Sequence, residues 1–402
     1  MHKTRIEFPT RLVYEGSAKI KVPELCVKNK EPLDHLISKA PVFYNPIMRL
    51  NRDFCILALN VFQKSLAKPV TVCEPMCGTG VRGIRIALEV PEISRVVLSD
   101  INPKAVQLAF ENARLNNVSE KVRIRWMDAN LLLSLHSHPN SRFDYIDIDP
   151  FGSPVKYMDS TLRAINYGGM IALTATDMAP LCGVNPRTCL RKYGSLPIRA
   201  SYCHELAVRI LTGSLIRIAA RFDLAATPVL SYATNHYIRL YAILRKGIKI
   251  ADTILKQVGF VRHCPKCLNR KTLDLNEATP KIECKTCGSE MLLSGPLWIG
   301  ELANKGFVEE MLENSERAGL WDPKSLKMLH LLLGEIGQPP TFFNIDELCS
   351  RVGVESIPTD LVVEDLRKKS FNASKTHFDE RGVKTNADVS ELYETLKALS
   401  RR

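Results

Sequence analysis

Short apolar runs alternate with helical patterns between residues 70 and 174, and this alternation constrains the fold of the 402-residue chain more than any other feature. Strands are predicted at 70–73, 95–99, 122–126, 143–148 and 170–174, with helices at 81–89 and from Pro103, where Asn102 is the expected cap. Apolar strands that alternate with helices form parallel sheets covered by helices. We therefore expect an α/β, Rossmann-like sheet with helices on both faces and binding sites at the carboxyl ends of its strands.

The charge and the cysteine usage restrict the partners and the compartment. A net charge of +12 favours polyanionic partners such as nucleic acid or an acidic membrane surface. No apolar run reaches the ~18 residues that a membrane span needs, and the N-terminus has no apolar signal core. Four of the twelve cysteines fall into two close pairs, which is typical of a reducing compartment. We expect a cytoplasmic monomer with no membrane association.

The chain is long enough for more than one domain. Two β-rich runs within 228–245 are expected to close the sheet, so we assign residues 1–245 to the first domain. Residues 246–402 predict a smaller α+β domain with helices at 304–318, 325–333, 345–351 and 359–369. The last two helices and the polar stretch 375–384 suit a small winged-helix-like unit.

A glycine-rich turn directly follows the first predicted strand. Gly78, Gly80 and Gly83 form the pattern Gly-x-Gly-x-x-Gly, which lets a chain turn tightly and lets a ligand approach the backbone. Asp100 ends the next strand, where an acid can accept hydrogen bonds from both ribose hydroxyls. Dinucleotide enzymes and S-adenosylmethionine enzymes share this plan.

Acidic residues around the turn favour S-adenosylmethionine over NAD. Glu74 stands at the start of the turn, where it would repel a pyrophosphate but tolerate a cationic ligand. Asp128 ends the third strand, where its carboxylate can accept a hydrogen bond from an adenine amino group. Three acids at three consecutive strand ends therefore predict a nucleoside with a sulfonium tail.

The fourth strand ends in Asp147-Ile148-Asp149-Pro150-Phe151. An exocyclic amine is a poor nucleophile, and a carboxylate that accepts its N–H directs the remaining lone pair at a methyl donor. Asp149 is the predicted acceptor and Phe151 the ring that stacks on the base. Asp147 precedes Asp149 by one side-chain period, so both should face the same side. The alternative is that Asp149-Pro150 only begins a turn.

Two cysteine pairs lie in the second predicted domain. Cys264 and Cys267 are followed after sixteen residues by Cys284 and Cys287, and this spacing predicts a structural zinc ribbon at about 260–290. Disulfides or free thiols are the alternative. Two basic sets are candidates for phosphate contacts: Lys266, Arg270, Lys271, Lys281 and Lys285 beside the cysteines, and Arg187, Arg191, Lys192, Arg199, Arg209, Arg217 and Arg221 after the fifth strand.

Several motifs together resemble the tRNA (guanine-N2-)-dimethyltransferases, class I S-adenosylmethionine-dependent enzymes that methylate guanosine 26 of tRNA. The motifs lie at 41–46, 50–53, 78–83, 149–154, 174–177, 180–183, 203–205, 376–378 and 384–385. The resemblance runs over nearly the whole chain. It implies a class I methyltransferase domain, a C-terminal tRNA-binding domain, and transfer of methyl groups to the N2 amine of guanosine 26.

The resemblance also implies roles for individual residues. Contacts to S-adenosylmethionine are implied for Arg52, Arg82, Asp100, Asp128 and Ala129, whereas Asp149 would be catalytic and Phe43 and Phe151 would line the transfer pocket. Three alternatives stay open. The chain could methylate another exocyclic amine in RNA or DNA, bind RNA as an inactive zinc-ribbon protein, or use NAD.

Overall fold

The computed structural model describes residues 6–25, 36–37, 39–234, 236–277, 282–317 and 323–401. The chain forms two compact units. The first comprises 1–150, 156–173 and 310–325, and the second comprises 151–155, 174–309 and 326–402. Neither unit contains, among its described helices, one that is long and apolar enough to cross a membrane.

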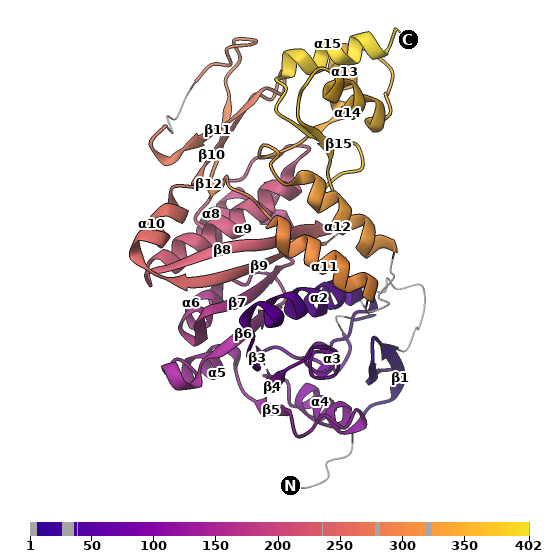
Figure 1. The fold of residues 1–402 in the computed structure, drawn as a ribbon, viewed down its shortest axis with the longest axis vertical. Coiled ribbons are helices and arrows are strands. Elements are labelled where there is room, and N and C mark those ends of the chain that lie inside the picture. Colours follow the sequence, from indigo (N-terminus) through magenta and orange to yellow (C-terminus); the bar gives the residue numbers. More distant parts are fainter. Residues whose placement is uncertain are drawn as a thin grey trace. The chain divides into compact units, whose positions relative to one another are not determined.

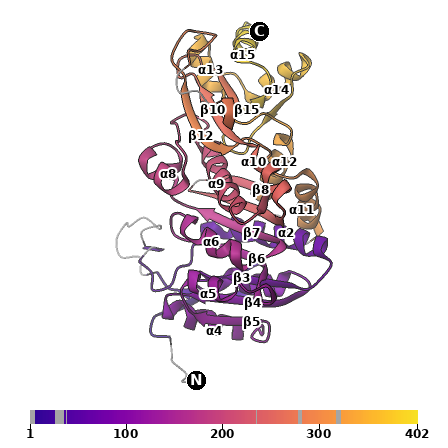
Figure 2. The same cartoon turned by 90° about the vertical axis from the view of Figure 1, so that its left-hand side faces the viewer.

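A seven-stranded sheet contains all the strands predicted for the first domain (Figures 1 and 2). Its order is β5-β4-β3-β6-β7-β9-β8. The strands are β3 (Val70–Glu74), β4 (Ile93–Asp100), β5 (Val122–Trp126), β6 (Phe143–Ile148), β7 (Ile165–Ala175), β8 (Leu224–Thr234) and β9 (Tyr237–Lys246). The five predicted strands are confirmed and pair in parallel from β5 to β7. The sheet is nevertheless mixed, because β8 and β9, which are separated by only two residues in the sequence, pair antiparallel.

The strand order explains where a binding site can form. Strand β3 has β4 on one side and β6 on the other, because the chain runs outward from β3 through β4 to β5 and then crosses back to β6. Ligands of such sheets bind at this switch point, beyond the carboxyl ends of the strands. The ends of β3 and β6, at Glu74 and Ile148, therefore border the candidate site.

Helices of the first unit pack beside these strands. They are α2 (Arg49–Leu66), α3 (Val81–Glu89), α4 (Pro103–Leu115), α5 (Ala129–Leu135) and α6 (Val155–Ala164). The cap of α4 is confirmed, because the Asn102 side chain accepts a hydrogen bond from the backbone N–H of Lys104. Sequence patterns did not predict α2 or the hairpin of β1 (Thr10–Glu15) and β2 (Ala18–Pro23). Helix α2 buries polar Asn51, Arg52 and Asp53, which obscure an apolar stripe.

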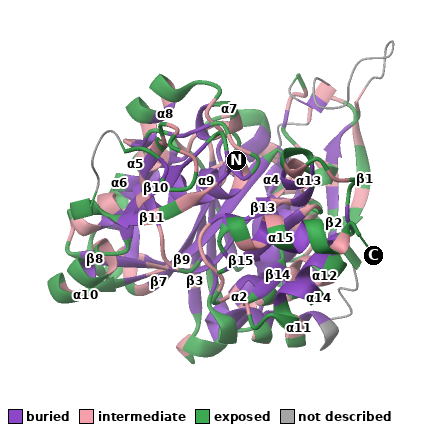
Figure 3. Ribbon diagram, turned by 90° about the horizontal axis from the view of Figure 1, so that it is seen from above, coloured by how far each residue is buried: buried purple, intermediate pink, exposed green. Residues whose placement is uncertain are grey.

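The second unit carries two smaller sheets besides strands β8 and β9. The first has the order β11-β10-β12 and the second β13-β15-β14. Their strands are β10 (Val258–His263), β11 (Arg270–Asp274), β12 (Leu292–Trp298), β13 (Phe343–Asn344), β14 (Ala373–Lys375) and β15 (Gly382–Thr385). Figure 3 shows the strands β3 and β9 buried, whereas α10 (Ile248–Leu255) is largely exposed.

The helices predicted for the C-terminal part are confirmed within a few residues. They are α11 (Lys305–Arg317), α12 (Pro323–Glu335), α13 (Ile345–Val352) and α14 (Thr359–Lys368), and a further helix, α15 (Val389–Leu399), closes the chain. Helices α13, α14 and α15 share one apolar core that includes Leu348, Leu366 and Leu392. The helices and the three-stranded sheet thus give this part the α+β character expected from the sequence.

A buried charge cluster holds the C-terminal part of the second unit to helix α9 (Cys203–Ala220). The fully buried carboxylate of Glu205 accepts hydrogen bonds from the ammonium of Lys384 at 2.7 Å, from the backbone N–H of Thr341 at 2.7 Å and from Arg209 at 2.9 Å. Burial alone would raise the pKa of Glu205, but Lys384 and Arg209 bring it down to about 2. The motifs at 203–205 and 384–385 therefore meet in this scaffold.

Candidate active site

The glycine-rich turn joins β3 to α3 in the geometry that the pattern predicts. Gly78 has φ +52° and Gly80 has φ +77°, in the region that favours glycine. A Cβ on Gly78 would lie 3.0 Å from the carbonyl oxygen of Phe43, and one on Gly83 would lie 2.4 Å from the Leu98 side chain. The first two glycines thus shape the turn, and the third lets α3 approach the sheet.

Two predicted cofactor acids end the neighbouring strands β4 and β5. Asp100 is half-buried, and its carboxylate accepts hydrogen bonds from the backbone N–H groups of Gly78 and Asn102, both at 2.9 Å. Asp128 is exposed and caps helix α5 by accepting from the backbone N–H of Leu131 at 3.1 Å. Ala129 begins that helix and is buried. Asp100 is therefore bound to the glycine turn. Asp128 follows the neighbouring strand, β5, and faces solvent.

Arg82 gathers three acids and an amide around one buried guanidinium. Its Nε donates to Glu74 at 3.2 Å, and one terminal nitrogen donates to Asn51 at 2.8 Å and to Asp147 at 3.1 Å. The other terminal nitrogen donates to the Asp149 carboxylate. The Arg82 side chain is only 4% exposed. The turn after β3 and the end of β6 are thereby joined through a single side chain.

The shared partner confirms that Asp147 and Asp149 face the same side, as their spacing predicts. Asp147 is fully buried, and its carboxylate also accepts a hydrogen bond from the hydroxyl of Tyr145 at 2.6 Å. Asp149 keeps 20% of its side chain exposed. Asp149 is thus the carboxylate of the pair that a ligand can reach, and Asp147 supports it from inside.

Glu74, the acid predicted at the start of the turn, is enclosed by its neighbours. It is 4% exposed, and it accepts a hydrogen bond from the backbone N–H of Gly83 at 3.1 Å. Burial raises the pKa of Glu74 to about 8; Asp147 and Asp149 add to the rise, and Arg82 opposes it. Burial in this position therefore favours the protonated, neutral form of the carboxyl group.

A second buried ion network supports the first, and sequence reasoning missed its main members, Glu15 and Arg85. Arg52 donates two hydrogen bonds to the Glu15 carboxylate, at 2.5 and 2.6 Å. Arg85, fully buried on α3, pairs with Glu15 at 3.1 Å and with Asp53 at 2.6 Å. Burial would raise the pKa of Glu15, but Arg52 and Arg85 lower it. One sequence signal could have pointed to this network: Arg85 lies on the face of the predicted helix 81–89 that is expected to be buried.

The two predicted aromatic residues both present surface to solvent. Phe43 is 37% exposed and Phe151 is 74% exposed. The loop after Phe151 is held by Thr176, whose hydroxyl accepts from the backbone N–H of Gly152 at 2.7 Å and whose own N–H donates to the Gly152 carbonyl at 3.0 Å. A large exposed ring on an anchored loop is suited to stacking on a flat ligand.

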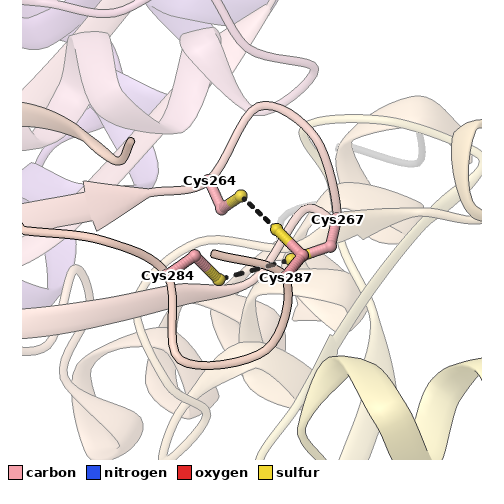
Figure 4. Close-up of side chains that lie close together, drawn as sticks. All are labelled: Cys264, Cys267, Cys284 and Cys287. Atoms are coloured by element: carbon pink, nitrogen blue, oxygen red, sulfur yellow. Dashed lines mark hydrogen bonds between the residues drawn. The ribbon is translucent and has the colours of Figure 1, made fainter. Parts of the chain in front are cut away.

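The four predicted zinc cysteines lie together on two matching turns of the second unit (Figure 4). The sulfurs of Cys264 and Cys287 are 3.4 Å apart, and those of Cys267 and Cys284 are 3.5 Å apart. These distances are too long for a disulfide, and the described cysteines are all free thiols. In each turn the N–H of the first cysteine donates to the carbonyl five residues on, at 2.7 and 2.8 Å. Four convergent thiols in paired turns are the donor set of a structural zinc site.

The structure divides the predicted basic residues into internal and surface groups. Arg209 and Arg217 donate to buried partners, and Lys192 pairs with Asp177 at 2.9 Å. Arg270 packs its guanidinium 3.7 Å from the centre of the Phe343 ring, so it is not a surface contact. The exposed candidates are Arg187, Arg191, Arg199, Arg221, Lys266, Lys271 and Lys285. Lys281 lies outside the described residues.

The raised pKa of Glu74 predicts a pH-dependent stability. Between the ordinary value of 4.5 and about 8, the folded protein holds a proton that the unfolded chain lacks, so stability falls as pH rises through this window. Replacing Glu74 by glutamine keeps the group neutral and should flatten that fall. Thermal melting across this pH range measures it, with Glu120→Gln, an exposed glutamate, as the matched control. Parallel curves for wild type and Glu74→Gln would contradict the assignment.

Comparisons with known proteins now identify the family. The family model described as N2,N2-dimethylguanosine tRNA methyltransferase matches residues 16–397. A tRNA (guanine(26)-N(2))-dimethyltransferase of Methanothermobacter thermautotrophicus is 39% identical over 390 residues, covering 96% of this chain and 98% of the relative. A tRNA (guanine(26)-N(2)/guanine(27)-N(2))-dimethyltransferase of Aquifex aeolicus is 35% identical, covering 96% of each chain.

A solved structure agrees with these relatives. Trm1 from Pyrococcus horikoshii, in complex with S-adenosyl-L-methionine, superimposes with a TM-score of 0.83 at 33% identity, covering 96% of this chain and 99% of that one. The predicted Rossmann-like methyltransferase fold is thereby confirmed. With a family model that spans nearly its whole length, this chain belongs to the N2,N2-dimethylguanosine tRNA methyltransferase family.

Proposed function

We propose that this chain transfers methyl groups from S-adenosylmethionine to the N2 amine of guanosine 26 in tRNA, giving N2-methyl- and N2,N2-dimethylguanosine. The observation that carries the proposal is the position of Asp149. In a member of this family, a half-buried carboxylate held by Arg82 directly follows β6, and Arg82 itself lies just after the glycine turn that follows β3. We place the activity in the cytoplasm, in a monomer, where the free cysteines remain reduced.

The cofactor site we propose lies along the carboxyl ends of β3, β4 and β5. Gly78 and Gly80 form its floor, and Asp100, Asp128 and Ala129 line it beyond. The cofactor supplies an electrophilic methyl group on a sulfonium. These residues suit a polar ligand. The buried amide nitrogen of Asn51 and the buried hydroxyl of Thr79 have no hydrogen-bond partner among the described residues, and buried polar groups normally have one.

Arg52, Arg82 and Glu74 complete the proposed cofactor site as residues that shape it. Arg82 orients Asp149 and carries the positive charge that keeps this carboxylate in place. Glu74 fixes both Arg82 and the first turn of α3 through Gly83. Arg52 is held by Glu15 and also donates to the backbone carbonyl of Asn45 at 3.1 Å. These three side chains are therefore held in place before the ligand binds, so a contact with the ligand would not require them to reorder.

The residues at the end of β6 would prepare the base for reaction. Asp149 accepts a hydrogen bond from the N2 amine, which directs the nitrogen lone pair towards the methyl donor. The amine loses one proton when the N–C bond forms, and Asp149 is the group we assign to receive it. Phe151 stacks on the guanine, and Phe43 is the second aromatic residue that we assign to the pocket lining. A base held inside an RNA fold must first be extruded to reach such a site.

The second part of the proposal concerns tRNA and zinc. We assign the methyltransferase domain to residues 1–245 and the tRNA-binding domain to 246–402, with a structural zinc ion held by Cys264, Cys267, Cys284 and Cys287. The exposed arginines after β7 and the exposed lysines beside the cysteines would contact phosphates. The strong positive charge of the chain supports a polyanionic substrate.

Replacing Asp149 by asparagine should lower the rate of methyl transfer by at least ~100-fold, because the side chain can no longer take up the amine proton. Binding of S-adenosylmethionine, measured by calorimetry, should change little. The matched control is Asp159→Asn, an aspartate on α6 whose side chain is 65% exposed. Equal losses of binding and transfer in Asp149→Asn would remove Asp149 from the catalytic role.

Incubation with labelled S-adenosylmethionine and tRNA tests the substrate. Transfer to unmodified tRNA is expected, and a tRNA with guanosine 26 replaced by adenosine should accept no label. Nucleoside mass analysis should find N2-methyl- and N2,N2-dimethylguanosine. Label at guanosine 27 in the substituted tRNA would extend the substrate to that position. Label on another amine would favour a methyltransferase with a different target. No transfer with intact tRNA binding would favour an inactive RNA-binding protein.

Removal of one ribbon cysteine tests the zinc proposal. The Cys264→Ser protein should contain one zinc equivalent less than wild type and should melt at a lower temperature, because structural zinc stabilises small domains directly. Elemental analysis of the purified chain measures the metal. Cys349→Ala is the control, since this buried cysteine lies on α13 and is not among the four clustered cysteines. Unchanged zinc in Cys264→Ser would refute the site.

A further inference from the structure

A second group of metal-binding side chains lies in the second unit, outside the ribbon. The ligand atoms of Cys182, Cys203 and His204 all lie within 4.8 Å of one another. The thiol of Cys182 also approaches the backbone carbonyl of Cys203 at 3.7 Å. These residues belong to the sequence motifs at 180–183 and 203–205, to which neither methyl transfer nor the zinc ribbon gives a role.

Local structure on both sides brings the three side chains together. Cys182 caps the C-terminal end of helix α7 (Met178–Leu181), and its backbone N–H donates to the carbonyl of Met178 at 2.7 Å. The next residue, Gly183, has φ +85°, and a Cβ there would lie 2.9 Å from the backbone of Ile198. Only glycine permits this approach, which carries the end of α7 against the segment before α9.

The other two side chains stand on the first turn of α9. Cys203 is its first residue, and its N–H donates to the carbonyl of Ala200 at 3.0 Å. His204 follows directly. Their neighbour Glu205 points elsewhere, since its carboxylate is engaged by Lys384 and Arg209 in the buried cluster. The helix therefore directs one acid into the core and leaves a thiol and an imidazole beside Cys182.

We propose that Cys182, Cys203 and His204 bind a soft divalent cation, with Zn²⁺ as the ion of choice. Two sulfurs and one imidazole nitrogen within one small volume match the ligand preferences of zinc. Binding would release the two thiol protons, so two thiolates balance the charge of the ion. A disulfide would need only the cysteines, whereas the histidine supplies a third donor.

This site would differ from the ribbon in having three protein ligands instead of four. All three side chains are partly exposed, so a water molecule or a donor atom of a bound molecule would take the fourth position, as in open zinc sites. The ion would tie the end of α7 to the start of α9. Helix α7 directly follows the segment that holds the Phe151 loop through Thr176.

Metal analysis of the full-length chain tests the proposal independently of the ribbon. Wild type, Cys182→Ser, Cys203→Ser and Cys189→Ser would be purified side by side, desalted, and measured for zinc per chain. Cys182→Ser and Cys203→Ser should each hold one equivalent less than wild type. Cys189→Ser should hold the same amount as wild type, since Cys189 is a buried cysteine on α8 (Pro186–Tyr193) outside the ligand group.

Two further measurements keep the proposal testable if a serine variant folds poorly. In His204→Gln, which retains both thiols, competition with a chelator should show zinc leaving this site at least roughly tenfold more readily than in wild type. Cys182→Ser and Cys189→Ser would also be loaded with Co²⁺ in place of zinc. The absorption that arises from thiolate-to-cobalt charge transfer should be weaker in Cys182→Ser than in Cys189→Ser. Equal metal content in these two variants, or a Cys182–Cys203 disulfide in the mass of the native protein, would overturn the proposal.

Discussion

The candidate active site depends on the buried guanidinium of Arg82. Glu74 from the end of β3, Asp147 from β6 and Asp149 from just beyond β6 all bind this one cation. A buried charge is costly unless it is paired and hydrogen-bonded, so these groups hold one another in position. Three carboxyl groups crowd one positive charge, and the raised pKa of Glu74 relieves part of their repulsion. Asp149 is left as the member that a substrate can reach.

The start of helix α2 connects this cluster to the rest of the first unit. Three consecutive residues bind three different partners: Asn51 accepts from Arg82, Arg52 donates to Glu15 of β1, and Asp53 pairs with Arg85 of α3. Successive residues of a helix point about 100° apart, which lets one turn contact several elements. The N-terminal hairpin, the glycine-rich turn and the end of β6 are thus linked by buried charged groups, which solvent ions screen little.

Helix α9 organises the second unit in the same manner. Its first three residues divide their roles, because Glu205 enters the core beside Lys384 while Cys203 and His204 turn towards Cys182. Glu205 and Lys384 lie 179 positions apart in the sequence. The resemblance to a family pointed to the motifs at 203–205 and 384–385, but it did not show that they contact each other.

The sequence by itself determined the parallel strands, the glycine turn, the four clustered cysteines and the family, because periodicity, spacing and motifs are local or repeated patterns. It also placed Asp147 and Asp149 on one side, since strand side chains alternate. Only the tertiary structure decided that Glu74 is buried with a raised pKa and that Glu15 and Arg85 support the site. Burial and charge pairing arise when distant segments meet, and no local pattern records which segments will do so.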